Sequence, residues 1–63
     1  MFDDVIRFAA GQGYSLEIAP SGDQFEYMFH KTGEDFPFYS DITESRHLKA
    51  EVQTAILAVK AKI

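Results

Sequence analysis

The sequence predicts an α+β domain of the order α-β-β-β-α, in which a three-stranded antiparallel meander carries both helices on one face. Two observations predict this fold class. Apolar residues recur at helical spacing in the first ten residues and again in the C-terminal third of the chain. Between these segments, three short runs alternate apolar and polar residues, and turns that contain glycine separate them. Residues 1–63 are therefore expected to form a single domain.

The first helix is predicted over residues 2–10. Asp3 and Asp4 lie in its first turn, where carboxylates interact favourably with the positive end of the helix dipole. Gly11 and Gly13 follow and are expected to end the helix. The apolar residues that share one face of this helix are Phe2, Val5, Ile6 and Ala9.

Three strands are predicted from the two-residue alternation that follows. The second run occupies the centre of the meander, because short turns at residues 20–23 and 32–35 join it to both neighbours. Pro37 has no backbone N–H to donate to a neighbouring strand, which places the third run at an edge of the sheet. The apolar residues of the three runs are Tyr14, Leu16 and Ile18, then Phe25, Tyr27 and Phe29, then Phe36 and Phe38.

A long helix is predicted from residues 41–44 to the C-terminus. Asp41 and Glu44 have the spacing of a capping box, in which two side chains three residues apart accept hydrogen bonds from free backbone N–H groups. The stripe expected to cover the sheet consists of Leu48, Val52, Ala55, Ile56, Val59 and Ile63. A second stripe, on roughly the opposite side, consists of Ala50, Thr54, Leu57 and Ala61. Because a helix with two apolar stripes needs two neighbours, the second stripe is a candidate interface.

The composition limits the kinds of protein that the chain can be. It contains no cysteine, which excludes disulfides and thiolate zinc sites. Its first residues are acidic, whereas a secretory signal begins with positive charge, and its longest fully apolar run, residues 55–59, is too short to span a membrane. A cytoplasmic protein without membrane contact is therefore expected. A domain this short buries a small core, so we also expect a homo-oligomer.

The charge is distributed unevenly along the chain. The net charge of −4 divides into −6 over residues 1–41 and +2 over residues 42–63. Duplex nucleic acid is not an expected partner, because binding to phosphates depends on clustered lysine and arginine. The acidic half supports an alternative hypothesis: a phage-type or host-encoded inhibitor whose acidic face imitates nucleic acid and blocks a nucleic-acid-binding protein. The residues of this acidic face are Glu17, Glu26, Glu34 and Asp35.

No catalytic, cofactor-binding or metal-binding residue is expected. Glu44, His47 and Glu51 have the spacing of a di-iron ligand motif on one helical face, but such a site requires matching ligands from other helices. A polar helix face is therefore favoured over a metal site, which only a symmetric dimer would complete. Glu34 and Asp35 are adjacent acids in a turn where no neighbour would desolvate either carboxylate, and we interpret them as solvated turn residues.

The predicted function is that of a small, non-enzymatic protein-interaction or regulatory module that self-associates, with no cofactor. One candidate surface is the second helix stripe around Leu57. The other is a face of the sheet that carries Met28, His30 and Tyr39, because methionine and aromatic residues are enriched in interfaces. His30 is equally compatible with an ordinary surface position. The sequence does not decide between the sheet face and the helix stripe, nor does it identify the partner protein.

Part of the chain resembles a known family. The segments concerned are Gly13-Tyr14, Asp23-Gln24-Phe25-Glu26-Tyr27, Gly33, Ser40 and Ile56-x-x-Val59-Lys60. Over about residues 13–60 they are similar to the repeat unit of the YegP-like family of small bacterial proteins. The resemblance implies a short β-meander followed by one helix, and it assigns no functional residue.

The order of elements is also similar in topology to that of double-stranded RNA-binding domains. Those domains bind RNA through basic residues at the start of their last helix. The corresponding segment of this chain carries Asp41 and Glu44 beside Arg46 and Lys49, so that its charges largely cancel. RNA binding is therefore not expected.

Overall fold

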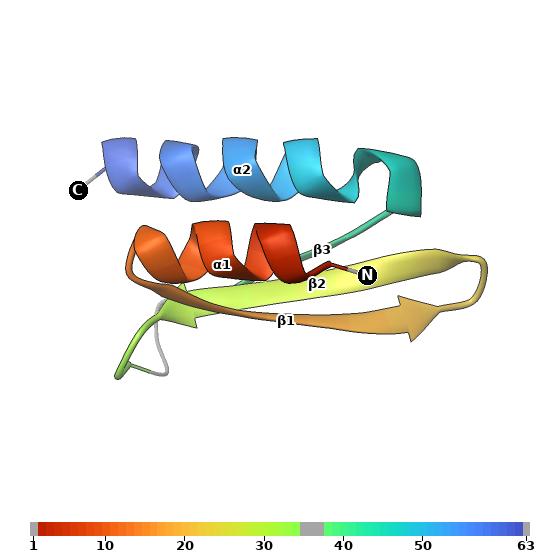
Figure 1. Ribbon diagram of the computed structural model, residues 1–63, viewed down its shortest axis with the longest axis horizontal. Helices are drawn as coiled ribbons and strands as arrows, with labels where there is room; N and C mark the ends of the chain where they lie inside the picture. Colours follow the sequence, from red (N-terminus) through yellow and green to blue (C-terminus); the bar gives the residue numbers. More distant parts are fainter. Residues whose placement is uncertain (1, 35–37, 63) are drawn as a thin grey trace.

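A computed structural model shows two helices that lie on one side of a three-stranded sheet (Figure 1). The structure describes residues 2–34 and 38–62. This architecture confirms the predicted α+β fold class and the order α-β-β-β-α. The elements are α1 (Asp3–Gly11), β1 (Tyr14–Ser21), β2 (Gln24–Lys31), β3 (Phe38–Thr43) and α2 (Ser45–Ala61).

The sheet is an antiparallel meander of order β1-β2-β3, which confirms the predicted central position of the second strand. Ser21 pairs with Gln24, so the first hairpin closes with the two-residue loop Gly22-Asp23. Gly22 has a φ of 64°, the conformation that a type II′ turn requires at its first loop position and that glycine adopts without steric cost. Pro20 lies in β1, an edge strand, where a residue without a backbone N–H is tolerated.

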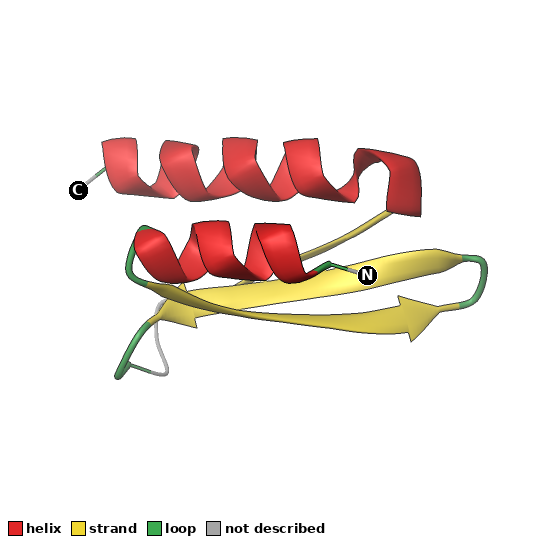
Figure 2. Ribbon diagram, viewed as in Figure 1, coloured by secondary structure: helices red, strands yellow, loops and turns green. Residues whose placement is uncertain are grey.

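The core lies between the helices and the face of the sheet that they cover (Figure 2). Its buried apolar residues are Val5, Ala9, Tyr14, Leu16, Tyr27, Phe29, Leu48, Val52, Ala55 and Ile56. The predicted core stripe of α2 is confirmed at its four buried members, and Val59 packs partly buried against the same cluster. Ile63, which was assigned to this stripe, lies outside the described residues.

Phe29 is at the centre of an aromatic cluster in this core. Its ring meets the Tyr14 ring edge-on at a centroid distance of 5.6 Å and stacks on the Tyr39 ring at 4.9 Å. The ring of Tyr27 lies parallel to that of Phe29 at 6.5 Å. One aromatic ring from each of β1 and β3 thus contacts the central strand, which ties the three strands together through side chains as well as backbone hydrogen bonds.

The prediction for the third strand was wrong in where the strand ends and in the face that Tyr39 occupies. Phe36 lies outside the described residues, and β3 continues to Thr43, which pairs with Phe25. The observed register places Tyr39, Asp41 and Thr43 on the side of the helices. The physical reason is that the backbone of residues 41–43 pairs with β2, and this pairing requires an extended conformation. The same residues therefore cannot begin the helix.

The predicted capping box was also wrong. Asp41 lies in β3, where its carboxylate accepts a hydrogen bond from the backbone N–H of the next residue, Ile42. The helix begins later, at Ser45, and its N-cap residue Glu44 makes no side-chain capping bond. The Glu44 carboxylate instead accepts a hydrogen bond from Nε of Arg46 at 2.8 Å.

Candidate functional site

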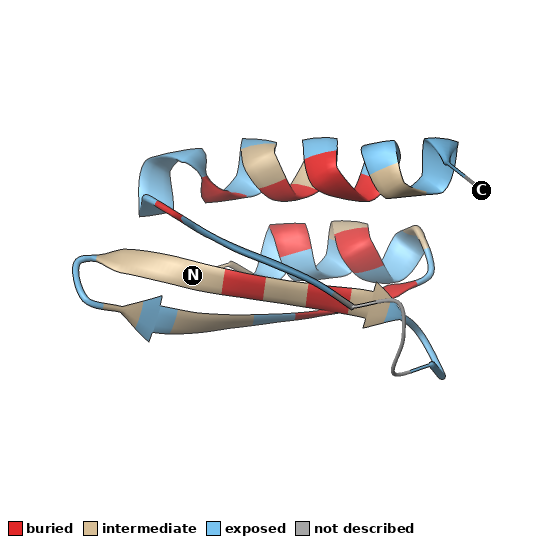
Figure 3. Cartoon of the chain, turned by 180° about the vertical axis from the view of Figure 1, so that it is seen from behind, coloured by how far each residue is buried: buried red, intermediate tan, exposed pale blue. Residues whose placement is uncertain are grey.

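A groove lies on the covered side of the sheet, between α2 and the edge strand β3. It has a volume of about 570 Å³, within the range of typical ligand sites. It remains open because α1 packs on β1 and, of the strands, α2 packs more on β2 than on β3. Most of the α2 residues that line it also have small side chains. The lining residues are Tyr27, Tyr39, His47, Ala50, Glu51, Thr54, Ala55 and Ala58. Figure 3 shows that β3, beside this groove, is exposed over most of its length.

The groove combines aromatic surface with a few polar groups. Tyr39 stacks on Phe29 yet keeps 37% of its surface exposed, so that its ring forms part of the wall. The hydroxyl of the buried Thr43 donates a hydrogen bond to a carboxylate oxygen of Glu51, which holds that carboxylate at the sheet side of α2. Ala50, Thr54 and Ala58 provide an almost flat helical wall opposite.

Tyr27 lies at the bottom of the groove with 1% of its surface exposed. Burial raises the pKa of its phenol, because it disfavours the charged phenolate, and the neighbouring Tyr39 hydroxyl raises the pKa further. The carboxylates of Asp41 and Glu51 act in the same direction through their negative charge. Two acidic groups therefore lie near the phenol at the bottom of the groove.

Two lysines of α2 make their contacts away from the groove. Nζ of Lys49 lies 2.8 Å from Oδ2 of Asp4 on α1, and this hydrogen bond is the main cause that lowers the pKa of the Asp4 carboxyl. Nζ of Lys60 donates to Oε1 of Gln12 at 2.7 Å. These contacts link α2 to the α1 side of the molecule, and no lysine or arginine is among the residues that line the groove.

The groove brings together residues from the two candidate interfaces. Ala50 and Thr54 of the second helix stripe form part of its wall, and so does Tyr39 of the proposed sheet face. Leu57 lies one turn further along α2 with 52% of its surface exposed, and Ala61 is also exposed. The helix stripe and one residue of the sheet thus belong to one continuous surface.

The assignment of Tyr39 to the same sheet face as Met28 and His30 was wrong. Tyr39 pairs with Phe29, and paired residues of neighbouring strands point to the same face. Met28 and His30 alternate with Phe29 along β2 and lie on the open face, which neither helix covers. The error has a simple cause, because a shift of one residue in the third strand moves each of its side chains to the other face.

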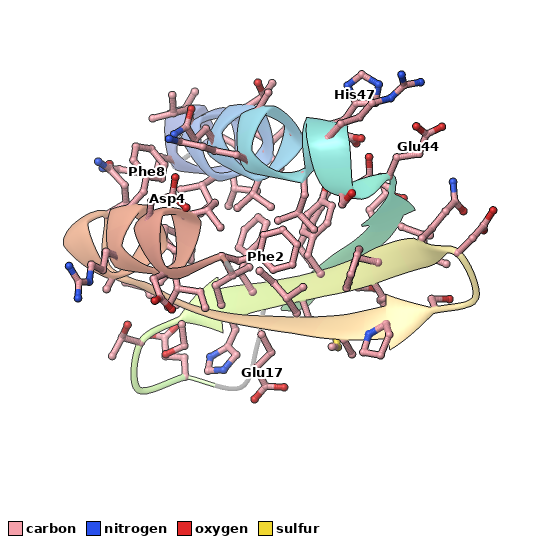
Figure 4. All side chains as sticks on the ribbon, turned by 45° about the vertical axis from the view of Figure 1, so that its right-hand side comes forward. Phe2, Asp4, Phe8, Glu17, Glu44 and His47 are labelled. Carbon is pink, nitrogen blue, oxygen red and sulfur yellow. The ribbon has the colours of Figure 1, made fainter. Side chains whose placement is uncertain are left out.

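The predicted acidic face is partly assembled on this open face. Glu17 and Glu26 both lie there, on neighbouring strands, and Figure 4 shows Glu17 below the sheet, on the side away from the helices. Glu34 is exposed in the turn that follows β2. Asp35 lies outside the described residues.

Several groove residues were not assigned to an interface from the sequence. Tyr27 was interpreted as core, and His47 and Glu51 as a polar helix face or, with Glu44, as a metal motif. Within residues 2–34 and 38–62, no group of three or more potential ligands is arranged to hold a metal ion. The four-residue spacing of His47 and Glu51 was the only available signal that they share a side of α2.

A second, smaller cavity of about 270 Å³ lies at the C-terminal ends of both helices. Gln12, Gly13, Tyr14, Lys31 and Lys60 line it. The two lysines suggest an anion site, but helix C-termini carry partial negative charge and disfavour an anion. The hydrogen bond from Lys60 to Gln12 is better explained as a structural link between the ends of the two helices.

No helix in the described part of the chain is both long enough and apolar enough to cross a membrane. Comparison of the chain with protein-family models, with curated proteins and with solved structures found no match. The resemblance to the YegP-like repeat unit therefore stays a prediction.

Proposed function

We propose that this protein is a non-enzymatic protein-interaction module that self-associates through one flank of α2. The observation that supports the proposal is the continuity of the groove with the exposed helix stripe. Leu57 is the most exposed of the large apolar side chains that the structure describes. We call the stripe Ala50, Thr54, Leu57 and Ala61 the α2 flank.

The spacing of the α2 flank is self-complementary. If two copies of α2 pack antiparallel about a two-fold axis midway between positions 55 and 56, position 50 faces position 61 and position 54 faces position 57. Ala50 then lies against Ala61 of the second copy, and Leu57 lies against its Thr54. Small residues opposite one another allow the helix axes to approach to about 8–10 Å, so both leucines would be buried.

Leu57→Asp is expected to convert a dimer into a monomer. Because 52% of the Leu57 surface is exposed, each copy can bury about half of the 1.5–3 kcal/mol that a whole leucine side chain contributes. A dimer contains two such side chains, so we expect the dimer Kd to rise at least about tenfold. Sedimentation velocity over a range of concentrations measures this change, and circular dichroism checks that the variant is folded.

Ile6→Asp provides the matched control, because Ile6 is an exposed apolar residue of the other helix with 39% of its surface accessible. It should leave the dimer Kd unchanged within about threefold. A wild-type protein that sediments as a monomer at every concentration contradicts self-association. Equal dissociation by both substitutions excludes the α2 flank as the interface.

The open sheet face supports a second candidate function, inhibition of a nucleic-acid-binding protein by an acidic surface. Glu17 and Glu26 lie on that face, and the described strand residues that share it include no lysine or arginine. Lys31, the one lysine of the described strands, pairs with Tyr14 on the other face. A surface whose carboxylates are not balanced by lysine or arginine attracts a basic partner at long range and loses that attraction as salt is added.

Capture of basic proteins by the immobilised chain from its native cell, followed by elution with a salt gradient, tests this candidate. The bound partner should elute by about 0.5 M salt, where exposed charges are largely screened. The double substitution Glu17→Gln and Glu26→Gln should lower the salt needed for elution, whereas Leu57→Asp should not. Capture that resists salt, or that Leu57→Asp abolishes, contradicts an acidic mimic.

A further inference from the structure

The edge of β3 is available to a further strand. β3 pairs with β2 on one side, and within the described residues no strand pairs with its other side. The outward N–H and C=O groups of an edge strand can form a ladder with an extended segment of another protein. The groove lies directly beside this edge, between β3 and α2.

An added strand would direct alternate side chains toward α2. Side chains of paired strands point to a common face, and on β3 the residues of the helix side are Tyr39, Asp41 and Thr43. Every second residue of the bound segment would therefore point into the groove. Its volume of about 570 Å³ leaves space for such side chains.

The charges beside the groove favour a cationic side chain. Asp41 lies on the helix side of β3 and Glu51 lines the groove from α2. Neither is among the ion pairs of the described residues, which join Lys49 to Asp4 and Arg46 to Glu44. Both carboxylates raise the pKa of Tyr27, in agreement with negative charge at this end of the groove.

The chemistry of the groove wall favours arginine over lysine. Tyr39 exposes part of its ring, and a guanidinium group stacks on an aromatic face while it donates paired hydrogen bonds to a carboxylate. Glu51 is already held in place by the Thr43 hydroxyl, so less side-chain freedom is lost when it binds. An ammonium group offers neither the planar stacking surface nor the paired donors.

We propose that the groove binds an extended segment of a partner protein, which adds to β3 as a fourth strand and places an arginine between Tyr39 and Glu51. The inference deepens the proposed role as an interaction module, but it does not depend on self-association. The two surfaces share Ala50 and Thr54, whereas Leu57 does not line the groove. Binding is therefore best measured in the Leu57→Asp variant as well as in the wild type.

The probe is a fluorescent peptide of seven residues, Thr-Val-Thr-Arg-Thr-Val-Thr, which directs valine, arginine and valine to one face when extended. Binding is followed by fluorescence anisotropy. Glu51→Gln keeps an acceptor for the Thr43 hydroxyl and removes the charge, and it should weaken binding about tenfold. Replacement of the peptide arginine by glutamine should weaken binding by a similar factor. When both changes are combined, binding should be little weaker than with either change alone.

Glu17→Gln is the matched control, because it makes the same chemical change on the open face. It should change the peptide Kd by about twofold or less.

Amide chemical shifts should change along β3 and on the groove side of α2. The proposal is overturned if no binding occurs, if Glu17→Gln weakens binding as much as Glu51→Gln, or if the shift changes lie on the open face. If the wild type is a monomer and binds the peptide, self-association is refuted and strand addition is supported. If the wild type is a dimer and its Leu57→Asp variant does not bind the peptide, strand addition is refuted and self-association is supported.

Discussion

Replacing Phe29 with alanine is expected to lower the free energy of unfolding by about 3–5 kcal/mol. The Phe29 side chain is 1% exposed and contacts aromatic rings from β1 and β3, so its removal leaves a cavity at the point where the three strands meet. A domain of 63 residues has a total stability of about 3–9 kcal/mol. The substitution should therefore remove at least about a third of this stability, and urea titration followed by circular dichroism measures the loss.

Ile42→Ala is the control for this experiment. Ile42 lies in the same sheet, but its side chain points to the open face and is 48% exposed. Its replacement removes fewer carbon atoms than Phe29→Ala, and from a side chain that is already half exposed, so it should cost about 1 kcal/mol or less. Similar losses for both variants would show that the aromatic cluster is not the centre of the core.

Raising the pH above about 10 is expected to destabilise the wild type more than the Tyr27→Phe variant. The pKa of Tyr27 is raised in the folded protein above the value of about 10 that tyrosine has in an unfolded chain. Above pH 10 the unfolded chain loses this proton while the folded protein retains it, so that the unfolded state binds fewer protons. Stability that is fully present below pH 10 is therefore lost as the pH rises toward the folded pKa.

The difference between the two proteins isolates this one phenol. Other groups that titrate at high pH are present in both, and their contributions cancel in the comparison. Between pH 10 and the folded pKa, the wild type should lose about 1.4 kcal/mol of unfolding free energy per pH unit more than Tyr27→Phe. Parallel loss in the two proteins would show that Tyr27 is not protected from ionisation by burial in the groove.

Local patterns in the sequence were sufficient to predict the order of the elements and the core. The alternation at Tyr14, Leu16, Tyr27 and Phe29 reports directly which side chains of a strand share a face. The three- and four-residue spacing of Leu48, Val52 and Ile56 does the same for α2. These properties depend on neighbours in the chain, so they can be derived without knowledge of the tertiary contacts.

The boundary between β3 and α2 could not be predicted in this way. Residues 41–44 have a local spacing that favours a helix start, yet residues 41–43 pair with β2 and extend the third strand to Thr43. The competing partner, Phe25, is far away in the sequence. A local capping signal was therefore outweighed by a long-range ladder that no short sequence pattern reveals.

By itself, the sequence determined the α+β class, the meander and the covered face of the first two strands, because each follows from the periodicity of apolar residues along one element. It also identified Leu57 and its stripe as surface that the core does not use. Only the tertiary structure decided that Tyr39 joins Ala50, Thr54 and Glu51 in one groove. The strand register and the lateral position of α2 over the sheet bring these residues together, and both depend on contacts between elements that are distant in the chain.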